Sequence, residues 1–153
     1  MRGWLMGLGL AVILAAPAGA QTPERRAAIQ ADAEAQLLPC PDPRHPVCGP
    51  TREMFLLAYP GARAGTERNQ LQVAELLAEG ATPPMRRNPI DACAWASIAA
   101  SLSARRGADG RTPSRASMDA VSKRCLSLDQ VQQNTAQLRA RELLAVMGDD
   151  LRR

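Results

Sequence analysis

The chain has 153 residues, of which 46% are hydrophobic and 22% charged, and its formal net charge is +4. A chain of this length forms one domain, which excludes a multidomain enzyme and a long repeat array. Only 3% of the residues are aromatic, and the apolar residues are mainly Ala and Leu rather than Val and Ile. This composition favours helices over a sheet.

The first twenty residues have the organisation of a secretory signal peptide. Arg2 provides a positive charge, an apolar stretch runs from Leu5 to Ala16, and small residues lead to a cleavage point after Ala20. The apolar stretch is shorter than the about 20 residues that span a bilayer, and no later stretch is apolar enough to do so. We therefore expect residues 1–20 to be removed and the mature chain to be periplasmic or secreted, with a net charge of +3 because Arg2 is lost.

Four cysteines remain in the mature chain, and an even number in an exported protein predicts disulfides. Cys40 and Cys48 flank a loop dense in prolines, which cannot be helical. Cys93 and Cys125 each lie in a segment of helical pattern, so a bond between them would link two helices. Of the three possible pairings we predict Cys40–Cys48 and Cys93–Cys125. By lowering the chain entropy of the unfolded state, these bonds should stabilise the fold by about 2.6 and about 3.7 kcal/mol respectively.

A metal site is the alternative use of Cys40, His45 and Cys48. Such a site needs a fourth ligand, and His45 is the only histidine of the chain. Oxidation also competes with thiolate ligation outside the cytosol. We therefore expect no metal and no other cofactor, and the absence of a C-x-x-C motif argues against a thioredoxin-like redox centre.

Helix start and stop signals predict three helices before residue 80. Each has threonine or proline near its first turn, and proline or glycine follows its last turn. In the second helix, Phe55 and Tyr59 are four residues apart and share one face. The predicted helices cover residues 22–38, 49–59 and 66–79.

Three more helices are predicted in the rest of the chain. Asn88 and Pro89 begin a helix over residues 90–102 that is apolar or small on nearly every side, which is typical of a buried central helix. Another begins at Thr112-Pro113, and its positions Met118, Val121 and Cys125 share one face, so that Cys125 points inward. A capping box over residues 127–130 begins the last helix, which ends near Gly148. No segment alternates with period two, so the predicted fold is all-α with five or six helices.

Positive charge is concentrated in one stretch, since eight Arg or Lys but only three Asp lie between residues 86 and 124. Such a stretch attracts nucleic acid, anionic lipid or an acidic protein, although a solvated surface is the simpler explanation. The mature chain has three aromatic residues, too few for the stacking platform of single-strand binders, so we expect no nucleic-acid partner. The candidate partner-binding residues are Arg105, Arg106, Arg111, Arg115, Lys123 and Arg124.

The sequence contains no catalytic constellation that we identify. His45 stands alone in a proline loop, and the chain has no G-x-S-x-G, H-E-x-x-H, P-loop or G-x-G-x-x-G motif. A carboxylate-based hydrolase would require several acids to converge in one cleft. The acids available for such a cleft are Glu53, Glu75, Glu79 and Asp91, and we expect them to be solvated helix positions and the protein to be non-catalytic.

Residues 59–103 resemble one unit of the Sel1-like repeat family, a helix-turn-helix solenoid related to tetratricopeptide repeats. In the second helix, Asn88 stands where the family usually has Asp, Ala92 and Trp95 match the A-x-x-W step, and Ala99 and Ala100 match the paired alanines. Gly80 matches the closing glycine of the first helix. The chain departs from the family at Ala74 (usually Gly) and Leu77 (usually Tyr), and prolines replace the G-x-G-V loop. The segment around residues 126–136 loosely resembles the tail of periplasmic relatives.

The resemblance implies helical hairpins packed as a small right-handed bundle or solenoid fragment, and an adaptor or scaffold that binds another protein. It divides the mature chain into residues 21–58, which contain the disulfide loop, and residues 59–153, which contain the repeat and its capping helices. Small residues at 92, 99 and 100 would let two helices approach closely, with Trp95 filling the groove between them. A generic helical bundle remains the alternative. The alternative function is a small-ligand carrier with an apolar cavity among Phe55, Tyr59, Leu71 and Trp95.

Overall fold

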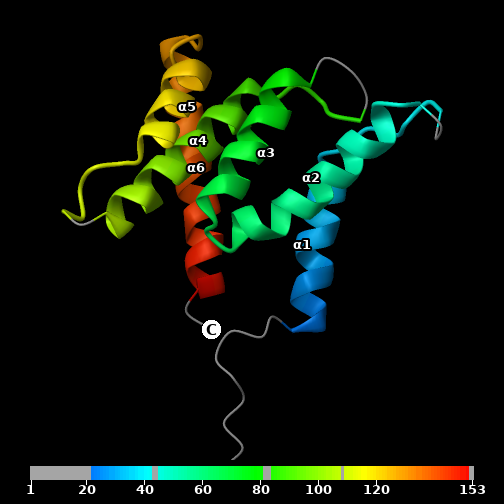
Figure 1. Cartoon of the computed structure of the whole chain (residues 1–153), viewed down its shortest axis with the longest axis horizontal. Helices are drawn as coiled ribbons and strands as arrows, with labels where there is room; N and C mark the ends of the chain where they lie inside the picture. The colour runs from blue at the N-terminus through cyan, green and yellow to red at the C-terminus, as the bar shows by residue number, and fades with distance from the viewer. Residues whose placement is uncertain (1–21, 43–44, 81–83, 108, 152–153) are drawn as a thin grey trace, which may run out of the picture.

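A computed structural model describes residues 22–42, 45–80, 84–107 and 109–151. These residues form six α-helices, and their only extended pairing is an isolated bridge between Leu37 and Met85. The predicted all-α fold is confirmed, whereas the predicted signal peptide at residues 1–20 lies outside the described residues. The helices are α1 (Pro23–Ala35), α2 (Cys48–Arg63), α3 (Glu67–Glu79), α4 (Pro89–Arg106), α5 (Arg115–Cys125) and α6 (Gln130–Leu151) (Figure 1).

Polar side chains cap the starts of α1, α4, α5 and α6 at or near the positions that the sequence indicates, whereas Val47 and Thr66 make no side-chain cap for α2 and α3. The Thr22 and Asn88 side chains accept hydrogen bonds from the backbone N–H groups three residues later, which fixes the first turns of α1 and α4. Helix α5 begins slightly later than predicted because Ser114 is its cap. The capping box of α6 is also displaced: Asp129 and Gln132 exchange side-chain and backbone hydrogen bonds, instead of the predicted pair at 127 and 130.

Helix α2 continues through Pro60, where the sequence predicts its end. A proline inside a helix removes one hydrogen bond and clashes with the preceding turn, but the turn that follows Pro60 is well anchored. Ala62 is fully buried and Arg63 reaches α1, so tertiary packing outweighs the local signal. Similarly, α6 passes Gly148 and ends at Leu151.

Helix α4 lies at the centre of the molecule, as its all-round apolar pattern predicts, and it packs against α3, α5 and α6 (Figure 1). Trp95 is 1% exposed, and Ala92 and Ala99 are fully buried. Ala100, the fourth predicted core position, is only partly buried. On the other side of the molecule α1 packs on α2, and α2 packs on α3. Trp95, Tyr59, Phe55 and the surrounding aliphatic side chains form one continuous core.

Both predicted disulfides are present. The Cα atoms of Cys40 and Cys48 are 5.9 Å apart, and those of Cys93 and Cys125 are 5.0 Å apart, which joins α4 to the last residue of α5. The prediction that Met118 faces inward with Cys125 is wrong, because Met118 is 53% exposed. The buried face of α5 instead carries Ser117, which is fully buried and exchanges a hydrogen bond with Ser103 of α4.

Candidate functional site

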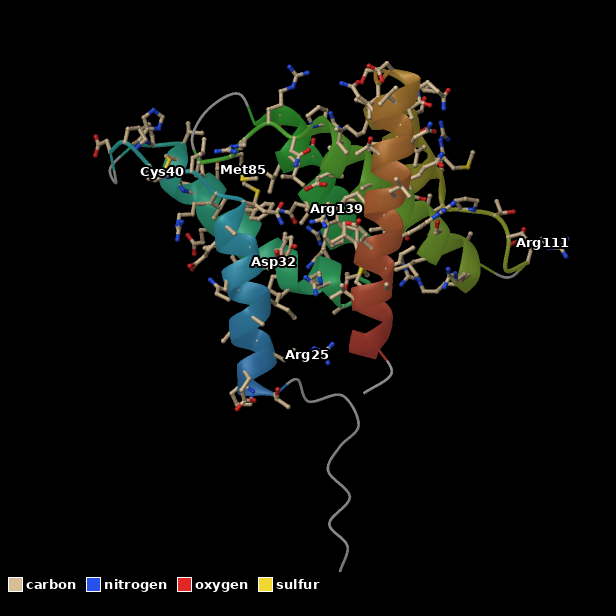
Figure 2. All side chains as sticks on the ribbon, turned by 180° about the vertical axis from the view of Figure 1, so that it is seen from behind. Arg25, Asp32, Cys40, Met85, Arg111 and Arg139 are labelled. Carbon is tan, nitrogen blue, oxygen red and sulfur yellow. A yellow bond between two sulfur atoms is a disulfide. The ribbon has the colours of Figure 1, made fainter. Side chains whose placement is uncertain are left out.

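The six basic residues proposed as a partner-binding rim do not form one cluster. Arg106 donates a hydrogen bond of 2.8 Å from Nη1 to the backbone oxygen of Gly65, so it ties the end of α4 to the connection between α2 and α3. Arg105 and Arg115 are exposed near this end of α4 and α5, and Arg111 lies at the tip of the connection between the two helices (Figure 2).

The other two basic residues lie at the far end of α5. Eight residues of helix separate Arg115 from Lys123, which is about 12 Å along the axis. Lys123 is exposed, and the Arg124 guanidinium lies 4.0 Å from the Glu79 carboxylate of α3. The structure therefore distributes the predicted rim over two ends of α5 and assigns two of its members to contacts within the molecule.

Of the four carboxylates named for a hydrolase, Glu75 and Glu79 lie near each other on α3, and the other two lie elsewhere. Glu53 is exposed on α2, while Glu75 and Glu79 are exposed on α3. Asp91, on α4, lines a different hollow together with Gln36. No cleft that we describe brings these four side chains together.

A groove of about 830 Å³ lies over α3, between α2 and α5. Its apolar surface comes from Met54 of α2, which is 41% exposed, and from the half-buried Leu71 and Leu76 of α3. The remaining lining side chains are polar or small, namely Glu67, Arg68, Gln72, Glu75, Glu79, Ser114 and Ala116.

The spacing of residues along α3 explains how one helix supplies both the apolar and the acidic part of the groove. Side chains four residues apart lie above one another on a helix, so Glu67, Leu71, Glu75 and Glu79 form one row. The opposite side of α3 carries Val73, Ala74 and Leu77, which are buried against the core. The helix is therefore fixed in orientation by its apolar face, and this row is presented outward.

A second hollow, of about 310 Å³, adjoins the groove and extends it along α2. The two hollows share Met54, Arg68 and Gln72. The extension adds Leu57, whose side chain is 72% exposed. Apolar side chains gathered beside a concave surface are typical of interaction sites, whereas scattered ones are not.

Carboxylates outnumber cations in the lining of the groove. The Glu67 carboxylate accepts a hydrogen bond from the Ser114 hydroxyl, which fixes it against the start of α5. Glu79 is paired loosely with Arg124 at 4.0 Å, and Arg68 is the cation of the lining. Among the described residues, Glu75 has no ion-pair partner. The groove is therefore acidic in a chain whose net charge is positive.

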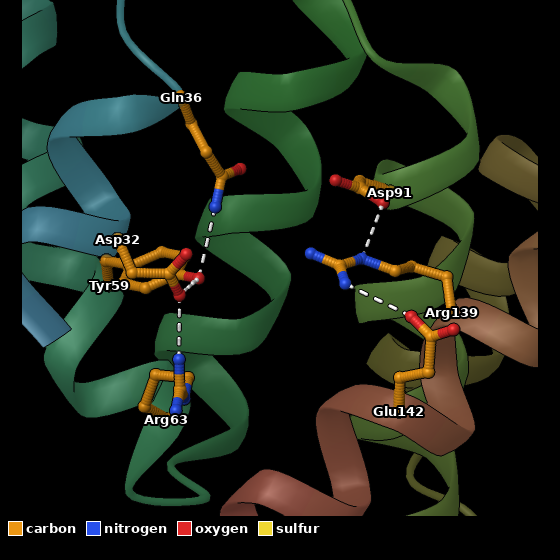
Figure 3. A network of polar contacts seen from close by, with 7 residues as sticks. All are labelled: Asp32, Gln36, Tyr59, Arg63, Asp91, Arg139 and Glu142. Atoms are coloured by element: carbon orange, nitrogen blue, oxygen red, sulfur yellow. Dashed lines mark hydrogen bonds and ion pairs between the residues drawn. The ribbon is translucent and has the colours of Figure 1, made fainter. Parts of the chain in front are cut away.

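Two polar clusters lie on the other side of the molecule, and Figure 3 shows them facing each other. In the first, the Asp32 carboxylate of α1 accepts hydrogen bonds from the Tyr59 hydroxyl at 2.6 Å and from Arg63 at 2.8 Å. Gln36 donates to the same hydroxyl at 3.0 Å. Burial and the neighbouring Asp32 carboxylate raise the pKa of Tyr59 well above its usual value, so the phenol stays protonated and donates. This cluster joins α1 to α2.

The second cluster joins α4 to α6. Arg139 donates from Nε to Asp91 at 3.3 Å and from Nη1 to Glu142 at 3.2 Å. Burial raises the pKa of Asp91, and this effect outweighs the opposing influence of Arg139. A hollow of about 230 Å³ between Gln36 and Asp91 lies beside both clusters. Each cluster is accounted for by its role in holding two helices together.

The aromatic residues named for a ligand cavity pack on one another instead. The ring centroids of Phe55 and Tyr59 are 5.5 Å apart, and those of Tyr59 and Trp95 are 5.7 Å apart in an edge-to-face arrangement. All three are at most 1% exposed. Leu71, the fourth residue named, lines the open groove over α3.

At the proline loop, Cys40 and Cys48 form a disulfide, so neither is available as a thiolate ligand for the alternative metal site. The His45 Nδ1 atom accepts from the backbone N–H groups of Val47 and Cys48 at 3.3 Å, which organises the start of α2. In the described part of the chain, no group of three or more His, Cys, Asp or Glu side chains is placed to hold a metal ion. Within those same residues, no helix has the length and apolarity needed to cross a membrane.

Sequence reasoning missed the groove, although two signals for it were present. Met54 and Leu57 are apolar but lie off the face that carries Phe55 and Tyr59. Glu75 and Glu79 are also four residues apart, a spacing that from the sequence alone is typical of a solvated helix face. Comparison with known proteins finds no matching family model, no matching curated protein and no matching solved structure.

Proposed function

We propose that this chain is a non-catalytic interaction module that binds a segment of another protein in the groove over α3. The observation that carries the proposal is the apolar surface of the exposed Met54 and Leu57 and the half-buried Leu71 beside a groove of about 830 Å³. Binding a protein segment there would bury apolar surface, which is the main source of favourable free energy in such complexes.

The arrangement of helices supports this role. Helices α3 and α4, which carry the resemblance to the Sel1-like repeat, pack against each other as a pair. Proteins built from such pairs commonly bind partners on extended concave surfaces. The two disulfides support a site of action outside the cytosol, in the periplasm or the medium, since disulfides persist there.

Site-specific photo-crosslinking in the cells that produce the protein tests the proposal. A benzophenone amino acid at position 54 lies in the groove, and the same amino acid at position 27 lies on an exposed part of α1 as the matched control. We expect a discrete crosslinked protein from position 54 that position 27 does not give. The same products from both positions, or none from position 54, would contradict the proposal.

A further inference from the structure

We infer that the partner segment for the α3 groove is cationic and amphipathic: it places apolar side chains on the groove floor and Lys or Arg side chains against Glu75 and Glu79. This inference rests on the proposed function and specifies the chemistry of the partner. Three features of the groove carry it, namely its apolar floor, the excess of carboxylates over cations in its lining, and its length.

The floor selects apolar side chains at one side of the segment. Leu71 and Leu76 are half-buried between the neighbouring helices, and Met54 stands at the edge beside them. Met is flexible and polarizable, so it adapts to differently shaped apolar partners. A wholly charged segment would leave this surface in contact with water.

The carboxylates select positive charge. Glu67, Glu75 and Glu79 line the groove against one lining cation, Arg68. Glu75 is exposed and has no ion-pair partner among the described residues. The Glu79 carboxylate forms one long ion pair, with the Arg124 guanidinium at 4.0 Å. The positive net charge of the rest of the chain does not cancel this local field, because charges further away than about 8 Å are screened at physiological ionic strength.

The same charges disfavour an acidic occupant. An acidic segment would meet the glutamates directly, and like charges brought together at an interface reduce affinity. The length of α3, 13 residues or about 20 Å, admits between three and four turns of a helical segment.

Selection from a phage-displayed library of random twelve-residue peptides tests the inference, with the mature disulfide-bonded protein as bait. Enriched peptides are then synthesised and titrated by fluorescence anisotropy against the unmodified protein, the Glu75→Gln/Glu79→Gln variant and the Met54→Asp variant. The matched control is Glu24→Gln/Glu34→Gln, which makes the same change of charge on α1, outside the groove.

We expect the enriched peptides to carry net positive charge with apolar residues three or four positions apart. Loss of two exposed ion pairs should weaken binding to the Glu75→Gln/Glu79→Gln variant by about two- to thirtyfold, and the control should bind as the unmodified protein does. Replacing every Lys and Arg of the peptide by Gln should weaken binding to the unmodified protein similarly. Raising the salt concentration should reduce this difference.

One result would overturn the inference while leaving the proposed function intact, namely the enrichment of neutral or acidic peptides that lose binding to Met54→Asp but not to the glutamine variant. Concentration-dependent dimerisation of the protein, measured by light scattering and abolished by Met54→Asp, would overturn both, since the occupant would then be a second copy. If no enriched peptide responds to Met54→Asp or to Leu71→Asp, while both variants retain the helical circular dichroism signal, the proposed function itself fails.

Discussion

The two sides of the molecule are held together by different forces. Around α4 the contacts are mainly apolar, with Trp95, Ile98 and the buried alanines packed among the neighbouring helices, although Ser103 and Asp91 also make polar contacts with α5 and α6. Helix α1 buries mainly Ile29 and Ala33, and much of its attachment to α2 is the polar cluster of Asp32, Tyr59 and Arg63. Apolar burial is non-directional and tolerant, whereas a polar cluster depends on each partner. The α1 side is therefore the side that should open first.

Trp95→Ala removes the largest side chain of the apolar side. The indole is 1% exposed and stands against Tyr59, so its loss leaves a cavity that the neighbouring helices fill only in part. We expect a loss of about 3–5 kcal/mol in the free energy of unfolding, measured by urea denaturation. Leu57→Ala, at a site 72% exposed, is the control and should change stability by less than about 0.5 kcal/mol. A small effect of Trp95→Ala would show that the centre of the bundle is loosely packed.

Removing each disulfide separately compares the two sides directly. Cys93→Ala/Cys125→Ala opens a loop with a sequence separation of 32, and Cys40→Ala/Cys48→Ala opens one of 8. From chain entropy we expect losses of about 3.7 and about 2.6 kcal/mol respectively, measured by the same denaturation. If the shorter loop has the larger effect, the α1 side depends on its disulfide more than loop length explains.

Tyr59→Phe removes a single oxygen atom, the hydroxyl oxygen, from the polar cluster between α1 and α2. The phenylalanine ring keeps the contacts with Phe55 and Trp95, but the Asp32 carboxylate and the Gln36 amide lose the hydroxyl group. We expect a loss of about 1–3 kcal/mol, with α1 affected first. Hydrogen exchange, read at the amides of α1 and of α4, distinguishes this local effect from a global one. Equal acceleration in both helices would contradict the proposed difference between the two sides.

Local chemistry made most of the fold predictable from the sequence. Helix caps such as Asn88, the all-round apolar pattern around Trp95 and the cysteine spacing depend on neighbours in the chain. The sequence predictions are wrong where a contact between residues far apart in the chain determines the structure. Helix α2 passes Pro60 because Arg63 reaches α1, and Met118 is exposed because the buried face of α5 is set by the contact of Ser117 with Ser103.

The candidate site was less predictable for the same reason. The groove exists only because α2 and α5 stand on either side of α3, and the sequence does not give that arrangement. The six basic residues lie within twenty positions of one another in the sequence, but α5, with 11 residues, separates Lys123 and Arg124 from the other four. Charge counted along the chain therefore indicates a single surface, which the fold divides.

The smallest effect is expected in the pH dependence of the free energy of unfolding of the Asp91→Asn variant. This variant tests the polar cluster that joins α4 to α6. Burial raises the pKa of Asp91 above its ordinary value of 3.8, so the folded protein holds this proton more tightly than the unfolded chain does. The resulting contribution to stability is complete below about pH 3.8 and is lost as the pH rises through the folded pKa. Asn does not titrate.

We therefore expect the free energy of unfolding of Asp91→Asn, relative to that of the unmodified protein, to rise between pH 3 and pH 7. Denaturation at several pH values measures the difference, and Asp119→Asn, at an exposed site, provides the control. A relative stability that falls over this range would mean that the ion pair with Arg139 outweighs burial. In that case the α4–α6 cluster stabilises the fold as an ion pair in the way that the Asp32 cluster does, and polar attachment is not confined to the α1 side.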